Sequence, residues 1–254
     1  MKITIAGYGV LGQAHKTILG HKHELRLADP LVLGKTVQDF ADDTDGVICC
    51  VSTPARHNGA CEMANVYDVI SQTKTSTPII IRSTISIEGW EMLTESFPEH
   101  NLTFCPEFLR SDHAEKDMWS ENVLFMGGGG VEFWHDVYSK AILNLSVGRM
   151  DPKLLIAGKY FRNAFLATKV SFFNQIFDFC KAKDIDYNLV AQLVGVDPRI
   201  GGSHTAITAE RGWGGHCFPK DTSAIIHSAE RDNVDLSVLK QAVEYNNKVR
   251  KTPE

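Results

Sequence analysis

A cysteine follows a glycine-dense stretch late in the sequence, Arg211-Gly-Trp-Gly-Gly-His-Cys217-Phe-Pro-Lys-Asp221. The residues after Cys217 are expected to begin a helix, whose N-terminal N–H groups and dipole favour a thiolate. A thiolate is a nucleophile that can form covalent intermediates. Asp221 could orient or tune this thiol. The alternatives are an unreactive core thiol at Cys217 and a simple N-terminal helix charge at Asp221.

Lys159 and Asn163 form a second candidate site. Both lie in a stretch that is expected to be helical, and residues four apart share one face of a helix. A lysine on a helix is usually a solvated charge, so the pair alone indicates little. The pair indicates a functional site only in combination with the cysteine-containing segment 211–221.

Three glycines near the N-terminus, Gly7, Gly9 and Gly12, have the spacing G-x-G-x-x-G. They follow an expected strand and open an expected helix, which is the setting of the dinucleotide-binding fingerprint. Such glycines permit a tight turn, a close approach of the backbone to a pyrophosphate and close helix packing, and the helix N-terminus stabilises negative charge. Val10 and Leu11 belong to the same expected binding turn.

Asp29 stands 17 residues after Gly12, at the end of the second expected strand. A carboxylate there would accept hydrogen bonds from a ribose diol and repel a ribose phosphate. No arginine follows immediately, so the pattern predicts NAD and not NADP as the cofactor. The alternative is a glycine-rich turn with an incidental aspartate.

Alternating strands and helices are expected over the first 150 residues. This alternation is typical of strand-helix-strand crossovers and of a mostly parallel sheet. The four glycines of 127–130 are expected to end a strand in a turn. We predict an α/β, Rossmann-like NAD-binding domain over residues 1–150. Expected strands cover 2–6, 24–28, 46–51, 78–82, 102–105 and 122–126, and expected helices cover about 10–19, 57–71, 87–96 and 131–143.

The pattern changes after Asp151-Pro152. Apolar residues recur at helical spacing over 153–183, where Gly158 is the only glycine and no proline occurs. This predicts one long helix, or two that meet near Gly158, as the start of a central all-α domain over 151–254. A helix of about 30 residues is about 45 Å long, more than its own domain needs, so we predict a homodimer through its apolar surface. Shorter helices are expected at 188–194, 221–229 and 236–249.

The composition argues against several classes of protein. With 254 residues, 43% hydrophobic and 22% charged, the chain is neither disordered nor fibrous. Its net charge of −5 and the lack of a basic run argue against nucleic acid as a partner. No apolar run approaches the roughly 20 residues of a membrane span and no signal peptide is visible, which predicts a cytoplasmic protein without membrane contact. No C-x-x-C or H-E-x-x-H pattern occurs, and His21 and His23 are expected in a solvated loop, so no metal is predicted.

Five segments resemble motifs of the UDP-glucose/GDP-mannose dehydrogenase family and follow that family's order. The resemblance extends over about residues 1–250. They are Val51-Ser-Thr-Pro54, Ser83-Thr84-Ile85, Pro106-Glu-Phe-Leu-Arg110, Lys159-Tyr-Phe-Arg-Asn163-Ala-Phe-Leu-Ala and Gly212 to Asp221.

The resemblance implies oxidation of a nucleotide sugar's primary alcohol, as in UDP-glucose, to a carboxylate with two NAD per turnover, a reaction of polysaccharide biosynthesis. After a first hydride leaves, the Cys217 thiolate would add to the aldehyde, and the thiohemiacetal would lose a second hydride to become a thioester that water hydrolyses. Lys159 and Asn163 would stabilise the negative oxygen on the reacting carbon. Thr84 would position a water that accepts the first proton, and Asp221 would assist the thiol.

The resemblance also implies binding roles. Thr53 and Lys220 would contact NAD. Glu107 would belong to the substrate loop and to the hydrolytic step, whereas the alternative is only an exposed ion pair with Arg110. The sugar nucleotide would lie against Phe108, Leu109, Arg110 and Gly214.

Two features depart from the family's pattern. After Arg110 the family usually has a second glutamate, whereas this chain has Ser111-Asp112. If Asp112 cannot replace it, release of the acid should be slow. Family members also usually carry a further nucleotide-sugar-binding domain, whereas this chain ends at Glu254. A truncated form, a natural minimal form and a form completed by a partner all stay open.

Two other functions are compatible with these residues. A dehydrogenase of related fold could oxidise a small hydroxy acid with Lys159 as the proton-transfer group, producing one NADH per substrate without need of Cys217. A catalytically silent NAD-binding protein would bind the cofactor without turnover. Such a scaffold has no physical use for Lys159, Asn163, Cys217 and Asp221 together.

Overall fold

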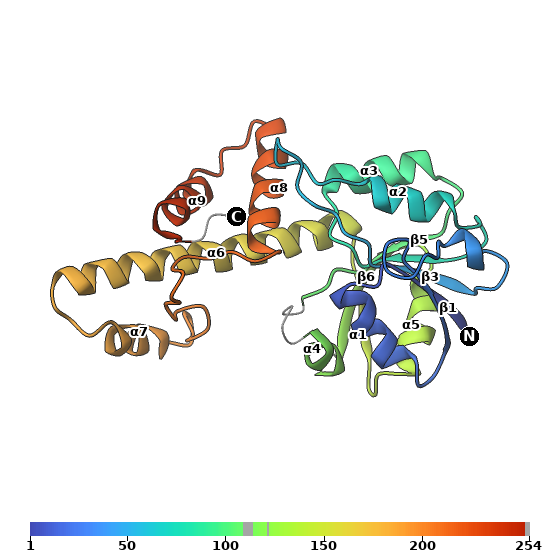
Figure 1. The fold of residues 1–254 in the computed structure, drawn as a ribbon, viewed down its shortest axis with the longest axis horizontal. Helices are drawn as coiled ribbons and strands as arrows, with labels where there is room; N and C mark the ends of the chain where they lie inside the picture. Colours follow the sequence, from blue (N-terminus) through green and yellow to red (C-terminus); the bar gives the residue numbers. More distant parts are fainter. Residues whose placement is uncertain (109–113, 121, 252–254) are drawn as a thin grey trace. The chain divides into compact units, whose positions relative to one another are not determined.

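The computed structural model describes residues 1–108, 114–120 and 122–251 (Figure 1). The contacts of the chain divide it into two units. One comprises Met1–Arg56 and Cys61–Lys159, and the other comprises His57–Ala60 and Tyr160–Glu254. The domain limits at residue 150, inferred from the sequence, stay a prediction.

The first unit contains a seven-stranded sheet in the order β2-β1-β3-β4-β5-β6-β7. Neighbouring strands are parallel except β5 and β6, which are antiparallel. This confirms the predicted α/β class with a mostly parallel sheet. The strand order reverses between β1 and β3, where such sheets form a crevice at the carboxyl ends of their strands. The strands are β1 Lys2–Ala6, β2 Glu24–Ala28, β3 Gly46–Cys49, β4 Ile79–Ile81, β5 Leu102–Phe104, β6 Val123–Gly128 and β7 Ser146–Arg149.

Helices cover both faces of this sheet (Figure 1). On one face lie α1 (Val10–Leu19), α4 (Ala114–Ser120) and α5 (Val131–Ser139), and on the other lie α2 (Ala64–Ser71) and α3 (Ile87–Ser96). A short 3-10 helix, η1 (Gln38–Phe40), follows β2. The main core forms where buried strand residues meet buried residues of α1 and α5, among them Ile5, Ile48, Ile18, Trp134 and Tyr138.

Some expected boundaries are wrong. Helix α2 begins only at Ala64, and the four residues His57–Ala60, which were expected in this helix, belong to the second unit. Strand β6 continues through Gly127 and Gly128, where a turn was expected. A Cβ at Gly128 would lie 2.4 Å from the carbonyl oxygen of Leu102, so the missing side chain lets β6 lie against β5. Strand β7 was not expected at all.

The second unit is helical. Helix α6, Pro152–Ala182, is one helix of 31 residues, which confirms the first of the two alternatives; its first residues belong to the first unit. Helices α7 (Tyr187–Gly195), α8 (Phe218–Arg231) and α9 (Ser237–Val249) follow. Two small clusters form its core, one around Phe173 and Tyr187 and one around Val170 and Trp213. No helix within the described ranges is both long and apolar enough to cross a bilayer.

Two of the described histidines of the first unit are buried. His15 of α1 has its Nδ1 2.8 Å from the carbonyl oxygen of Leu11 and its Nε2 2.8 Å from the Tyr138 hydroxyl. Burial, helped by the charge of Arg82, lowers the pKa of His15 to about 3. His23, expected in a solvated loop, is also buried, and burial lowers its pKa as well.

Acidification from pH 7 to pH 5 should therefore destabilise the folded protein by about 2 kcal/mol through His15. The folded pKa of His15 lies below its ordinary value of 6.5, so the unfolded chain takes up the proton first and stability falls as the pH drops through about 6.5. Urea unfolding at pH 7, 6 and 5 measures this loss. The variant His15→Gln should show a weaker pH dependence, and an unchanged dependence would contradict the assignment.

Candidate functional site

The turn between β1 and α1 leaves its backbone accessible. Gly7 has a φ of 91°, and a Cβ there would lie 2.7 Å from a carbonyl oxygen of the chain after β3. A Cβ at Gly12 would lie 2.0 Å from the carbonyl oxygen of Gly7, whereas a Cβ at Gly9 would meet no atom within 4 Å. Two of the glycines are thus required by packing, and the third faces open space. Val10 and Leu11 begin α1, where the first-turn N–H groups have no partner within the helix.

A pocket of about 320 Å³ is lined by residues from the ends of β1 and β2, by the segment after β3 and by α2. Gly7 and Asp29 line it. Asp29 accepts hydrogen bonds from the backbone N–H groups of Tyr8 at 2.8 Å, Leu31 at 3.1 Å and Val32 at 3.0 Å. Burial alone would raise the pKa of Asp29, but these three donors outweigh it and lower the pKa. The charged carboxylate and the open turn fit the ribose and pyrophosphate of a dinucleotide.

The two threonines singled out from the sequence lie together. The Thr53 hydroxyl donates to the carbonyl oxygen of Thr84 at 2.6 Å, and the neighbouring Ser83 hydroxyl donates to the carbonyl oxygen of Val51 at 2.8 Å. These bonds tie the segment after β3 to the segment after β4. They place both threonines at the same edge of the sheet as Asp29.

Lys159 forms an ion pair with Glu107 and also donates to the carbonyl oxygen of Glu107 at 3.1 Å. The side chains are only 4% and 18% exposed. Glu107 is therefore not an exposed loop residue, and Lys159 is not a solvated charge. Phe108, which follows, is half-buried. The adjoining Leu109, Arg110, Ser111 and Asp112 lie outside the described residues.

Cys217 is the N-cap residue of α8 and is half-buried. This confirms the predicted helix start. Asp221 is completely buried in the first turn. One oxygen of its carboxylate accepts from the Asn163 amide at 2.6 Å, and the other accepts from the Lys220 ammonium at 2.6 Å. The second unit thus brings together the α6 motif and the cysteine motif, which also includes the half-buried Gly214.

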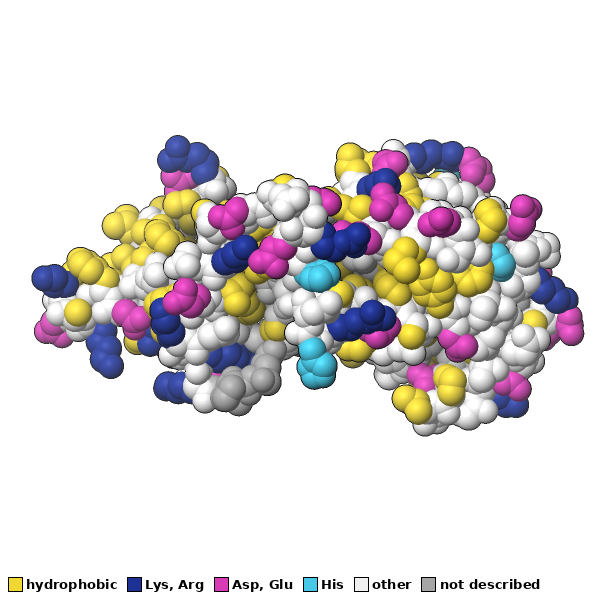
Figure 2. All heavy atoms as spheres, turned by 90° about the horizontal axis from the view of Figure 1, so that it is seen from above, with side chains coloured by type: hydrophobic (Ala, Val, Ile, Leu, Met, Phe, Trp, Pro, Cys, Tyr) yellow, Lys and Arg dark blue, Asp and Glu magenta, His cyan; other side chains and the backbone are white. Residues whose placement is uncertain are grey.

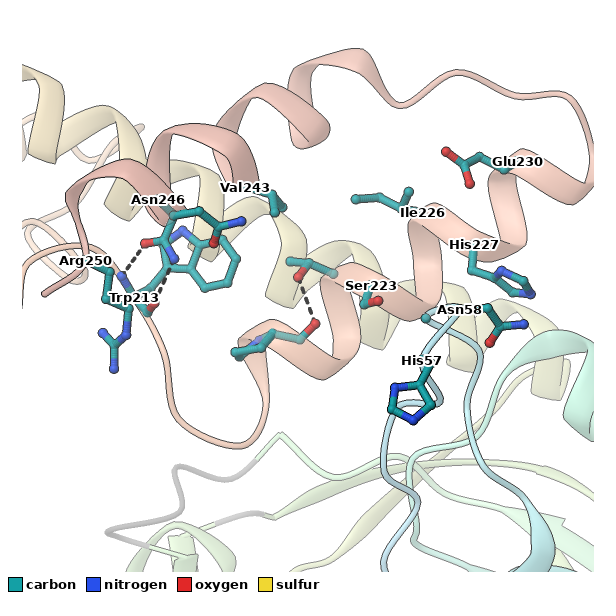
Figure 3. A pocket seen from close by; sticks show the side chains of 14 residues that line it. His57, Asn58, Trp213, Ser223, Ile226, His227, Glu230, Val243, Asn246 and Arg250 are labelled. Carbon is teal, nitrogen blue, oxygen red and sulfur yellow. Dashed lines mark hydrogen bonds between the residues drawn. The ribbon is translucent and has the colours of Figure 1, made fainter. Parts of the chain in front are cut away.

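Two buried asparagines, missed in the sequence, hold the segment before Cys217. Asn246 of α9 accepts from the backbone N–H of Trp213 at 2.7 Å and donates to its carbonyl oxygen at 3.0 Å (Figure 3). Asn174 of α6 accepts from the N–H of Gly212 at 3.1 Å and from Arg211 at 2.8 Å. A Cβ at Gly212 would lie 2.2 Å from the Asn246 oxygen. Glycine is therefore required there for this contact.

A groove of about 680 Å³ lies beside these asparagines, between α8, α9 and the segment His57–Ala60 (Figure 3). Trp213, Ile226 and Val243 supply apolar surface, and His57 and His227 supply imidazoles. None of the site residues inferred from the sequence lines it.

The other cysteines differ from Cys217. Cys49, Cys61, Cys105 and Cys180 are buried. Burial raises the pKa of Cys49 to about 11 and raises that of Cys50 further, which disfavours the reactive thiolate at both positions. The described part of the chain contains no group of three or more His, Cys, Asp or Glu residues that could hold a metal ion.

Comparison with known proteins supports the predicted family. Residues 157–248 match the model of the UDP-glucose/GDP-mannose dehydrogenase family, central domain, the family whose motifs the sequence resembles. The chain is 30% identical to the UDP-glucose 6-dehydrogenase of Rhizobium meliloti over 235 residues, which are 82% of this chain and 53% of the relative. It is 28% identical to UDP-glucose 6-dehydrogenase YwqF of Bacillus subtilis over 80% of this chain and 48% of the relative.

Solved structures show the same fold. A UDP-glucose dehydrogenase of Pyrobaculum islandicum has a TM-score of 0.82 and 22% identity, with 97% of this chain and 68% of that chain covered. A UDP-D-ManNAc dehydrogenase of Pyrococcus horikoshii has a TM-score of 0.80 and 16% identity, with 98% and 69% covered. The chain spans about half the length of the curated relatives it matches. Its relatives are thus nucleotide-sugar dehydrogenases.

Proposed function

We propose that this chain catalyses the NAD-dependent oxidation of a nucleotide sugar such as UDP-glucose to its uronate, through a thiohemiacetal and a thioester on Cys217. The observation that carries the proposal is the hydrogen bond from Asn163 to Asp221 at 2.6 Å. It connects the helix face of Lys159 and Asn163 with the helix start that bears Cys217. A scaffold protein would not need a buried carboxylate between these two motifs.

Asp221 acts as a positioning residue in this proposal. Its two oxygens hold the Asn163 amide and the Lys220 ammonium. Asn163 has a second N–H, which would stabilise the negative oxygen on the reacting carbon together with the Lys159 ammonium. The Cys217 thiolate would add to the aldehyde carbon. Lys220 and Thr53 would also contact NAD, and two NAD molecules, bound in turn, would each accept one hydride.

The remaining residues would bind and orient the ligands. Asp29 would hold the adenosine ribose, while the backbone of the turn from Gly7 to Gly12, with Val10 and Leu11, would hold the pyrophosphate. Thr84 would position the water that accepts the first proton, and Glu107 would serve the hydrolytic step. The sugar nucleotide would lie against Phe108, Leu109, Arg110 and Gly214.

Thermal unfolding with NAD and a panel of UDP- and GDP-sugars tests the proposal, because a ligand at 100 times its dissociation constant stabilises the native state by about 2.7 kcal/mol. Substrates that raise the midpoint are then assayed for NADH and acid. Two NADH per acid is the expected result. One NADH per substrate, with no effect of thiol alkylation, would favour a small hydroxy acid dehydrogenase. NAD binding without turnover would indicate a silent protein.

We further propose a homodimer through α6. Exposed phenylalanines recur along this helix at Phe161, Phe165, Phe172 and Phe179, and each is 49% to 67% exposed. The last three follow a seven-residue spacing, which keeps them near one face of the helix. Hydrophobic side chains are exposed on the surface of the second unit (Figure 2). A row of aromatic side chains of this size is typical of an interface.

The double variant Phe172→Asp/Phe179→Asp should be monomeric at concentrations at which the parent protein is dimeric, because two charges would be buried in the interface. Sedimentation equilibrium measures the change. The matched control is Val238→Asp on α9, since Val238 is 74% exposed and lies off α6. A double variant that still dimerises would contradict the assigned surface.

A further inference from the structure

A second carboxylate lines the pocket that contains Asp29. Helix α2 contributes Asn65, Asp68 and Val69 to this pocket, and its C-cap residue contributes Gln72. Their spacing is that of one helix face. Among the described residues that line the pocket, Asp29 and Asp68 are the only charged ones, and both are acidic. The pocket therefore offers acceptors to a ligand and no cation.

Gln72 provides hydrogen-bond donors beside the acceptor oxygens of Asp68. Its side-chain oxygen accepts from the backbone N–H of Gln38 at 3.2 Å, so its NH₂ group is the part that a ligand in the pocket can meet. Asn65 is fixed by a bond to the carbonyl oxygen of Ser52 at 3.0 Å. Asp68 and Gln72, four residues apart, thus present an acceptor from the last turn of α2 and a donor from its C-cap.

Apolar surface completes the pocket. Val37, 3% exposed, and Val69, 5% exposed, both line it. Val37 comes from the segment after β2, and Val69 comes from α2. Such surfaces suit the faces of a flat base, whereas the polar groups of α2 suit its edge.

We propose that Asp68 and Gln72 read the adenine edge of NAD, an inference that rests on the proposed cofactor. Adenosine has two donor groups, the ribose diol and the 6-amino group, and the pocket has two carboxylates. Asp29 would accept from the ribose and Asp68 from the amine, while Gln72 would donate to the ring nitrogen N1. Hypoxanthine reverses this edge, because its O6 accepts and its N1 donates. A ribose 2′-phosphate would face Asp29 without a neutralising cation among the lining residues.

The test compares binding of NADH with binding of reduced nicotinamide hypoxanthine dinucleotide, followed by nicotinamide fluorescence. The parent protein should prefer NADH by about tenfold, as a charge-assisted hydrogen bond predicts. Asp68→Ala should weaken NADH binding and remove the preference. The double variant Asp68→Asn/Gln72→Glu should bind the hypoxanthine analogue more tightly, since donor and acceptor are exchanged. Glu95→Ala, an exposed acid of α3, is the matched control.

The outcomes separate the two proposals. If the parent protein binds both dinucleotides equally, or if Asp68→Ala keeps the preference, the adenine reading is overturned while NAD remains the cofactor. If the parent protein binds neither, the cofactor proposal fails and this inference fails with it. The proposal that Asp68 and Gln72 recognise adenine is supported if Asp68→Ala loses the preference for NADH and the double variant reverses it.

Discussion

Replacing Cys217 by serine is expected to abolish formation of the sugar acid, with a rate at least about 10³-fold below that of the parent protein. The serine hydroxyl does not ionise near neutral pH, so it cannot form the thiohemiacetal from which the second hydride leaves. The helix start that favours a thiolate would gain nothing from a neutral hydroxyl. Acid and NADH, quantified together, measure the loss.

Selective alkylation gives an independent readout for Cys217. Iodoacetamide should modify it first, because the other cysteines are buried except Cys50, whose pKa burial raises. Cys50→Ser is therefore the matched control and should leave acid formation unchanged. Substrate present during alkylation should protect Cys217. Full acid formation by Cys217→Ser would contradict the covalent mechanism.

Local signals predicted much of the fold. The dinucleotide turn was predictable because the packing that demands glycine at Gly7 and Gly12 involves the turn itself and the strand ends beside it. The start of α8 directly after Cys217 was predictable because a glycine-dense loop ends there and Pro219 stands in the first turn. Helix α6 was predictable because its apolar residues recur over many turns without proline.

Short strands were harder to predict. Strand β7 has four residues, Ser146–Arg149, of which none is buried. Although it pairs with β6, its sequence therefore shows no alternation of apolar and polar residues that would predict a strand. Gly127 and Gly128 read as a turn because glycine is costly in a strand. In the structure, however, β6 lies so close to neighbouring backbone that a side chain would not fit, which favours glycine within this strand. The sequence does not reveal this close approach.

The polar contacts of the site are the least predictable part. Lys159 and Glu107 are 52 residues apart, and each alone reads as a surface charge. Asn174 and Asn246 read as polar helix residues, yet they are 1% and 3% exposed. Their amides hydrogen-bond the backbone of another segment only because the tertiary fold buries them against it. The role of these two asparagines therefore cannot be predicted from the spacing of residues in the sequence.

Replacing Lys159 by methionine is expected to lower kcat by roughly 10²- to 10³-fold, the usual loss when a group that stabilises a developing oxyanion is removed. The variant should also be less stable, because Glu107, 18% exposed, would lose the ammonium of Lys159. Removal of one partner from a buried ion pair costs about 3 kcal/mol. Steady-state kinetics and urea unfolding measure the two effects.

The double variant Lys159→Met/Glu107→Gln separates these effects. Glutamine removes the uncompensated charge, so the double variant should regain most of the lost stability. Its kcat should stay low, since the ammonium that would stabilise the developing oxygen is still missing and Glu107, assigned to the hydrolytic step, is replaced as well. The matched control is Lys181→Met, an exposed lysine in the last turn of the same helix, which should alter neither quantity. If the double variant recovered both stability and kcat, Lys159 would serve only to neutralise Glu107, and its proposed role at the reacting carbon would be wrong.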